Sequence, residues 1–209
     1  MKKLILIGGG GHCKSCIDVI EATNEFKIVG IIDQKKRVGT SLLSYPIIGT
    51  DENLLDFKGF ADFFFITLGQ IGLAKRRKEL FDFLQTNKLK MPTIISPFAI
   101  VSKHTQINEG TIIMHHAIVN ADSSIGKNCI INSKALIEHD AKILDHTHIS
   151  TGAIINGNVT IKENCFVGSN TTVNLGLSIK ENSIIASHSL VTKSLMKSGN
   201  YKGIPAYEF

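Results

Sequence analysis

The residue pair most suited to chemistry in this sequence is His139, followed directly by Asp140. An imidazole titrates near neutral pH, so a histidine can take a proton from a substrate under physiological conditions. A neighbouring carboxylate can stabilise the imidazolium that this transfer produces, as the acidic member of a catalytic triad does. His139 could therefore act as a general base with Asp140 as its acidic partner, but the residues alone fit an ordinary surface histidine equally well.

A second candidate site is the run of glycines at 8–11, which ends at His12. Glycines let phosphate oxygens approach backbone amides, and the N-terminus of the expected helix, 13–24, adds a partial positive charge. Asp33 closes the next expected strand and could reach a ribose or a base. Because Cys13 stands where the dinucleotide fingerprint has its third glycine, the loop favours a single nucleotide or a nucleotide sugar over NAD.

The elements around this loop are those of a small α/β domain. Aliphatic runs predict three strands and amphipathic runs predict two helices, at 3–7, 27–32 and 63–68 and at 13–24 and 75–84. Strand, glycine loop, helix and strand in this order predict a Rossmann-like βαβ unit. Gly69 and Gln70 follow the third strand, and Met91 and Pro92 mark the expected end of a domain covering 1–91.

A six-residue repeat governs the second half of the chain. Every sixth residue from Ile95 to Val191 is Ile or Val, and a small residue such as Cys129 or Cys165 usually lies four positions further on. Period six fits neither a helix nor an alternating strand. It predicts an all-β, left-handed parallel β-helix over 92–209, with about five coils and a C-terminal tail. The aliphatic residues would fill its interior, and the two cysteines would be packing residues.

Composition limits the classes of partner. The formal net charge of +5 is weak, basic residues are dispersed and tryptophan is absent, so nucleic acid is not an expected partner. With 43% hydrophobic residues the chain can bury a core, yet no apolar stretch is long enough for a membrane helix. We expect a cytoplasmic protein with reduced cysteines. Cys13 and Cys16 are not expected to form a redox pair, because the glycine loop does not suit such a motif.

A small nucleotide-binding α/β domain followed by hexapeptide coils resembles the NeuD/PglD-like sugar acetyltransferases of the sialic-acid and bacillosamine pathways. The resemblance covers essentially the whole chain. It rests on the residues after the three expected strands, on the segment 132–148 and on the ending Gly-Ile-Pro-Ala at 203–206.

The resemblance also implies roles for individual residues. His139 matches the general base of the family, and Asp140 matches the acidic neighbour that tunes it. Asn132 would contact the acceptor. Acetyl-CoA would be contacted by His148, Gly157, Ser169 and Ser187. The nucleotide sugar would be held by Gly10, Gly11, His12, Asp33, Gln34, Gly69 and Gln70. No metal is implied, and the oxyanion of the reaction would need a donor, expected to be a backbone amide of a coil.

The function implied is N-acetylation of a nucleotide-linked 4-amino-4,6-dideoxy sugar by acetyl-CoA in bacterial surface glycan biosynthesis, for example of lipopolysaccharide. The amine would attack the thioester directly, with no covalent enzyme intermediate. The family associates in threes, so we expect a homotrimer with active sites between subunits.

Three other functions remain open from the sequence. The first is O-acetylation of sialic acid or a related nonulosonic acid. The second is a zinc carbonic anhydrase, which some hexapeptide β-helices are, but Leu144 stands five residues after His139, where a second histidine ligand is expected. The third is a scaffold that lost its activity, against which the intact pair His139 and Asp140 argues.

Overall fold

The computed structural model describes residues 1–208, which form two compact units. The first unit holds residues 1–69 and 76–92, and the second holds residues 70–75 and the chain from residue 93 onward. The main division falls one residue from the expected boundary at 91. The short segment 70–75 is the difference, because it packs with the second unit. Within residues 1–208, no helix is long and apolar enough to cross a membrane.

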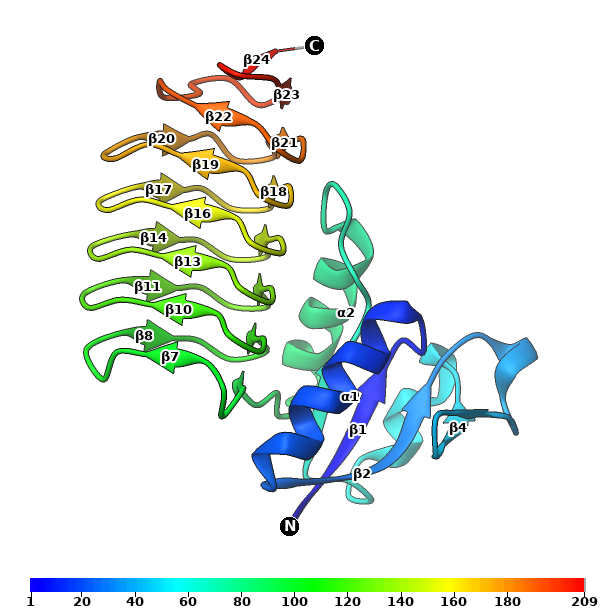
Figure 1. Ribbon diagram of the computed structural model, residues 1–209. Helices are drawn as coiled ribbons and strands as arrows, with labels where there is room; N and C mark the ends of the chain where they lie inside the picture. The colour runs from blue at the N-terminus through cyan, green and yellow to red at the C-terminus, as the bar shows by residue number, and fades with distance from the viewer. Residues whose placement is uncertain (209) are drawn as a thin grey trace. The chain divides into compact units, whose positions relative to one another are not determined.

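The first unit is built on a five-stranded sheet of order β3-β4-β2-β1-β5, in which only the β3–β4 pair is antiparallel (Figure 1). Its strands are β1 (Lys2–Ile7), β2 (Phe26–Ile32), β3 (Ser41–Leu42), β4 (Tyr45–Gly49) and β5 (Phe63–Ile66). Its helices are α1 (Gly11–Thr23), α2 (Lys75–Thr86) and the 3₁₀ segments η1 (Lys35–Arg37) and η2 (Asp51–Phe57). The predicted βαβ unit is confirmed. The β3–β4 hairpin and both 3₁₀ segments were not expected.

The alternation of side chains along β1 determines which face of the sheet packs against α2. Ile5 and Ile7 of β1 pack in one core with Leu80 and Leu84 of α2. Side chains in a strand alternate between faces, so Leu6, which is also buried, points to the opposite face. Both faces of the sheet are therefore buried. The loops that follow the parallel strands lie together at the carboxyl ends of the strands, where α/β folds bind ligands.

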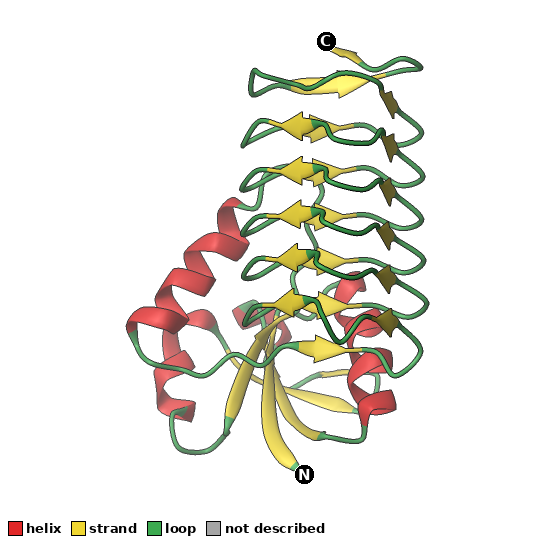
Figure 2. Cartoon of the chain, turned by 90° about the vertical axis from the view of Figure 1, so that its left-hand side faces the viewer, coloured by secondary structure: helices red, strands yellow, loops and turns green. Residues whose placement is uncertain are grey.

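The second unit is a left-handed parallel β-helix of stacked three-strand coils (Figures 1 and 2). Its first face consists of β6 (Ile94–Ile95), β9 (Ile112–Ile113), β12 (Ile130–Ile131), β15 (His148–Ile149), β18 (Phe166–Val167), β21 (Ile184–Ile185), β23 (Asn200–Lys202) and β24 (Tyr207–Glu208). Its second face consists of β7 (Ile100–Val101), β10 (Ile118–Val119), β13 (Leu136–Ile137), β16 (Ile154–Ile155), β19 (Thr172–Val173) and β22 (Leu190–Val191). Its third face consists of β8 (Gln106–Ile107), β11 (Ser124–Ile125), β14 (Lys142–Ile143), β17 (Thr160–Ile161) and β20 (Ser178–Ile179).

The interior of the prism is the predicted one from Ile113 onward, whereas in the first coil Ile95 is 39% exposed and Val101 and Ile107 are only partly buried. The repeated aliphatic residues from Ile113 to Val191 are buried, and the small residues of the second register pack among them. Burying one such side chain contributes roughly 1.5–3 kcal/mol, so the stack is held by its core. Cys129 and Cys165 lie in this core, as expected, and burial raises the pKa of Cys165 to about 11.

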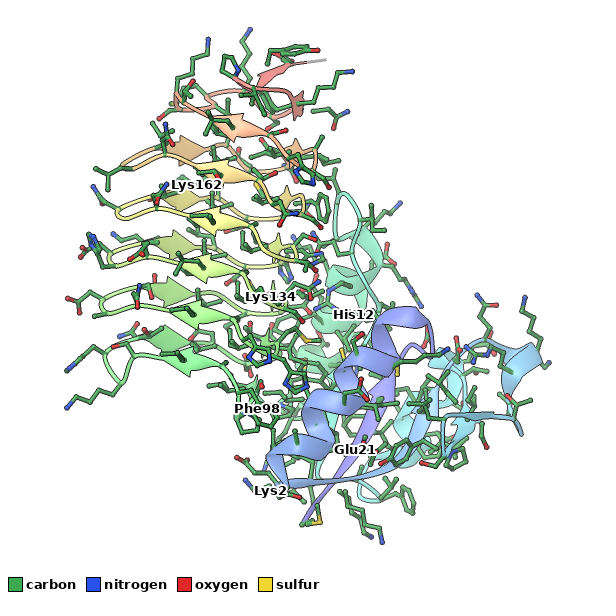
Figure 3. All side chains as sticks on the ribbon, viewed as in Figure 1. Lys2, His12, Glu21, Phe98, Lys134 and Lys162 are labelled. Carbon is green, nitrogen blue, oxygen red and sulfur yellow. The ribbon has the colours of Figure 1, made fainter. Side chains whose placement is uncertain are left out.

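A third register, which the sequence analysis did not use, sets the corners. Every sixth residue from 110 to 188 has a positive φ. Nearly all of these positions hold Gly, Asn, Asp or His, the residues that adopt the left-handed conformation most readily. Lys134 is the exception, at φ 60° (Figure 3). We call the turns between the first and second, second and third, and third and first faces the first, second and third corners. Within one coil they hold residues 151–152, 157–158 and 163–164.

Candidate active site

His139 and Asp140 form the turn after β13, at the second corner of the β-helix. Asp140 occupies the positive-φ position, at 61°, and its Oδ2 lies 2.7 Å from His139 Nδ1. Both side chains are exposed, at 60% for the histidine and 57% for the aspartate. The hydrogen bond to Asp140 raises the pKa of His139, and the charges of Asp140 and Glu138 act in the same direction. Since Nδ1 is bonded to the carboxylate, Nε2 is the nitrogen placed to take a proton.

Gly157 lies beside this imidazole, one coil further along the second corner. A Cβ at Gly157 would lie 2.8 Å from His139 Cε1, 2.9 Å from His139 Nε2 and 3.2 Å from Leu175 Cδ1. Its φ is outside the left-handed region, so space, not backbone conformation, is what favours glycine here. The missing side chain keeps the Nε2 edge of the ring open to a reactant. Gly157, expected to contact acetyl-CoA, is thus a neighbour of the expected base.

His148 has a different environment, because it is buried at 6% exposure on the first face. Its Nδ1 lies 2.6 Å from Gln70 O, and its Nε2 lies 3.1 Å from Asn132 Nδ2. A carbonyl only accepts, so Nδ1 donates to Gln70 and Nε2 accepts from the Asn132 amide. The Phe166 ring packs edge-on against the imidazole, with centroids 5.3 Å apart. Asn132 and His148 were expected to contact the acceptor and acetyl-CoA. The structure pairs them with each other, and His148 also with Gln70.

Gln70 fastens its own short segment to the third corner of the coils. Its Nε2 lies 3.3 Å from both His146 O and Cys165 O, and its side chain is buried. Ala74 N donates to Asn164 Oδ1 at 2.7 Å. Gln70 was expected to contact the substrate; the structure gives it an anchoring position.

Ser169 and Ser187 lie at the first corner, and Ser169 Oγ is 3.0 Å from Ser150 Oγ. His139 and Gly157 lie at the second corner. One whole face of the prism separates the two corners. A single copy of the chain therefore does not bring all the residues expected to contact acetyl-CoA together with the expected base.

The glycine loop of the first unit divides into a packed half and an open half. Gly8 has φ +103°, and a Cβ there would lie 2.5 Å from Leu68 Cδ2. A Cβ at Gly10 or Gly11 would meet nothing within 4 Å. No side chain caps the start of α1, whose N-cap is Gly10. The open half therefore exposes the N-terminus of α1, as a phosphate-binding loop requires.

His12 and Gly69, both expected to hold the nucleotide sugar, are neighbours in the first unit. A Cβ at Gly69 would lie 3.2 Å from His12 Cβ. His12 is half-buried in the first turn of α1 (Figure 3). The ends of β1 and β5 thus bring these two residues together beside the glycine loop.

Asp33 is already engaged within the first unit. Its Oδ2 pairs with the guanidinium of Arg37, which also donates to Gly9 O at 2.6 Å, and its Oδ1 accepts from Gln34 N at 2.8 Å. Asp33 was expected to reach a ribose or a base, but the structure shows both of its oxygens bonded within the chain. Arg37 is the residue that the sequence analysis missed. Its place four residues after Asp33 was the available signal.

A cleft of about 490 Å³ opens at the carboxyl ends of β1 and β2. Its apolar lining includes Ile7, Ile32, Leu68 and Leu80. Its polar lining includes Gln34, Lys35, Thr50, Asp51, Glu52 and Arg76. A cleft at this edge of a parallel sheet is where α/β folds bind nucleotides, and this one adjoins Gly8 and Asp33.

A larger hollow of about 940 Å³ lies in the same unit and is lined by Lys2, Lys58, Lys88 and Lys90 among others. No residue expected to act in catalysis or binding lines it. It is therefore not part of the candidate site.

His115 and Cys13 provide no second candidate base or nucleophile. His115 Nδ1 lies 2.7 Å from Ser96 Oγ, and its ring packs near Phe98. Burial raises the pKa of Cys13 to about 11. Among residues 1–208, no group of three or more His, Cys, Asp or Glu side chains is placed to hold a metal ion.

Comparisons with known proteins agree with the fold. The PglD N-terminal domain family matches residues 3–84. No curated protein matches the chain. An asparagine-for-histidine variant of perosamine N-acetyltransferase from Caulobacter crescentus, solved with CoA and GDP-perosamine, is 27% identical. The likeness covers 100% of this chain and 97% of that one, with a TM-score of 0.93.

Two further structures share the fold. The acetyltransferase domain of PglB from Neisseria gonorrhoeae, solved with acetyl coenzyme A, is 24% identical over 100% of this chain and 99% of that one, with a TM-score of 0.93. WeeI from Acinetobacter baumannii is 22% identical over 99% and 100%, with a TM-score of 0.85. The fold, the family match and the full-length likeness agree: the first unit carries a PglD N-terminal domain, and the whole chain is similar to a solved perosamine N-acetyltransferase.

Proposed function

We propose that this protein transfers an acetyl group from acetyl-CoA to the amine of a nucleotide-linked 4-amino-4,6-dideoxy sugar. The observation that carries the proposal is the exposed His139–Asp140 pair with Gly157 beside its ring. A general base must be reachable by the substrate, and this histidine is exposed while His148 is buried. The similar enzyme from Caulobacter crescentus, solved with CoA and GDP-perosamine, supports both substrates.

His139 carries the proton through the reaction. As the amine nitrogen attacks the thioester carbonyl, His139 Nε2 takes a proton from that nitrogen. The resulting imidazolium is stabilised by Asp140 and returns the proton to the departing thiolate sulfur when the C–S bond breaks. The new C–N bond is an amide, and no covalent enzyme intermediate forms. A backbone amide of a coil would donate to the developing oxyanion.

The nucleotide part of the substrate is assigned to the first unit. The open glycines Gly10 and Gly11 would admit the phosphates to the start of α1, with His12 and Gly69 beside them. The cleft next to Asp33 and Gln34 would take the nucleoside. A free sialic acid has no nucleotide to place there, which favours the amino-sugar nucleotide over the O-acetylation alternative.

A homotrimer would complete the site. His139 lies at the second corner, whereas Ser169 and Ser187 lie at the first. If three copies associate side by side, the second corner of one can meet the first corner of the next, and cyclic symmetry repeats this contact three times. Acetyl-CoA would then bind between two copies. We place the reaction in the cytoplasm, in the synthesis of a surface glycan such as lipopolysaccharide.

The proposal is tested by thiol release from acetyl-CoA over a panel of acceptors. The panel holds GDP-, UDP- and dTDP-linked 4-amino-4,6-dideoxy sugars together with free and CMP-linked sialic acids, and products are read by mass spectrometry. Acetylation of one amino-sugar nucleotide is the expected result. Acetylation of a sialic acid alone would contradict the proposal and support the O-acetyl alternative. No product with any acceptor would overturn both.

A further inference from the structure

We infer that the 490 Å³ cleft of the first unit selects guanine, with the Glu52 carboxylate recognising the base. The inference rests on the proposed function, because it names the nucleotide of that substrate. It follows from which charged groups of the cleft already have partners within the chain.

Most charged side chains that line the cleft are committed to each other or to nearby residues. Asp33 is paired with Arg37, and Asp51 is paired with Arg76. Arg76 also contacts Glu79 Oε2 at 3.0 Å, which holds its guanidinium at the wall. Arg37 neutralises Asp33, whereas Arg76 is shared by Asp51 and Glu79, so that cluster keeps one net negative charge.

Two lining residues differ from the others. Lys35 and Glu52 make no ion pair within the part of the chain that the structure describes, and both side chains are exposed. Glu52 stands on a fixed backbone, since Thr50 N donates to Asn53 Oδ1 at 2.7 Å at the start of η2. The cleft therefore presents one free carboxylate and one free ammonium to whatever enters it.

Guanine matches this pair of charges. Its N1–H and N2–H groups lie side by side and can donate to both oxygens of one carboxylate, and its O6 and N7 can accept from an ammonium. Uracil and thymine have a single N–H between two carbonyls, so a carboxylate would face at least one carbonyl oxygen. Adenine and cytosine offer one amino group next to a ring nitrogen that only accepts. Only guanine gives Glu52 two adjacent donors.

The apolar lining of the cleft supports a base in this place. Ile7, Ile32, Leu68 and Leu80 line the cleft together with the charged rim. Ile7, Ile32 and Leu80 are buried. Half-buried Leu68 therefore offers the apolar surface on which a flat ring can pack while its polar edge faces Glu52 and Lys35. Ligand sites of this kind combine an apolar surface with a few polar groups that fix orientation.

The test is calorimetric titration of the full chain with GDP, UDP, dTDP, CDP and xanthosine diphosphate. We expect GDP to bind roughly 10-fold or more tighter than UDP, the scale of one bidentate carboxylate pair. Glu52→Gln should weaken GDP by a similar factor. It should also improve xanthosine diphosphate, because an amide offers one donor and one acceptor to N1–H and O2 of xanthine. Glu79→Gln is the matched control, since Glu79 contacts Arg76 but does not line the cleft.

Each outcome has a distinct meaning. Preference for UDP, dTDP or CDP would overturn the inference and leave the proposed nucleotide-sugar function standing. Preference for GDP with no effect of Glu52→Gln would overturn the role given to Glu52. Binding of no nucleoside diphosphate would overturn the inference together with the proposed nucleotide site, whereas acetyl transfer to a sialic acid would remain measurable.

Discussion

Replacing Gly157 with alanine adds one methyl group directly against the His139 ring. The new carbon would lie 2.8 Å from His139 Cε1 and 2.9 Å from Nε2, where ordinary contacts begin at 3.4 Å. The ring, at the end of an exposed side chain, must therefore move by about 0.6 Å or rotate away from Asp140. Because a displacement of about 1 Å at a reacting group can cost about 100-fold in rate, we expect kcat to fall roughly 10-fold or more.

The fold should tolerate this change. The Gly157 backbone is outside the left-handed region, and its close contacts are the mobile side chains of His139 and Leu175. The free energy of unfolding should change by less than about 1 kcal/mol. Gly176→Ala is the control at the same corner. Its φ of +71° strains an alanine, whereas the space for a Cβ there is open. It should lose about 1 kcal/mol of stability through backbone strain and keep its kcat.

The assay is thiol release from acetyl-CoA with a saturating acceptor, paired with urea unfolding of both variants. If Gly157→Ala keeps the wild-type kcat, then either the His139 ring does not take the proton or Gly157 does not adjoin it during turnover. If both glycine variants lose activity equally, the contact with His139 is not the cause.

Three further predictions concern other parts of the chain. Asp140→Asn removes the main cause of the raised His139 pKa, so the acidic limb of kcat/KM, which rises with pH as His139 loses its proton, should shift to lower pH. An unmoved limb would show that another group controls it. Gly10→Leu fills the open space at the start of α1, so KM should rise for the nucleotide sugar and not for acetyl-CoA, and equal rises would count against separate sites. Burial raises the pKa of Cys13 and Cys165 to about 11, so both thiols should react slowly with a disulfide reagent at pH 8 until denaturant is added, and fast labelling of the native protein would contradict their burial.

The β-helix was predictable because the same packing requirement recurs in every strand and therefore appears as a repeat in the sequence. One aliphatic residue per strand must fill the prism, so the six-residue period alone predicts both the fold and the residues of its core. The corner register was equally visible, since every sixth position from 110 to 188 except Lys134 holds Gly, Asn, Asp or His. It also explains why Asp140 suits its place, because the left-handed turn and the contact with His139 both favour a short acidic side chain.

Contacts between residues far apart in the chain could not be read in the same way. His139 and Asp140 are adjacent, so their contact follows from the sequence itself. The hydrogen bond from His148 to Gln70 joins residues 78 positions apart, and the sequence around neither residue predicts it. The Arg37–Asp33 pair spans only four residues, and that spacing was a signal, but the contact depends on η1, a short 3₁₀ turn that hydrophobic periodicity does not reveal.

The central claim is that His139 is the base of an acetyl transfer, and the most direct test is the kcat of His139→Ala with the accepted amino-sugar nucleotide. We predict a fall of roughly 100-fold or more, the scale of a lost general base, with an unchanged melting temperature because the side chain is exposed. His104→Ala, which removes another exposed histidine of the β-helix, should leave kcat unchanged. Wild-type kcat in His139→Ala would contradict the claim.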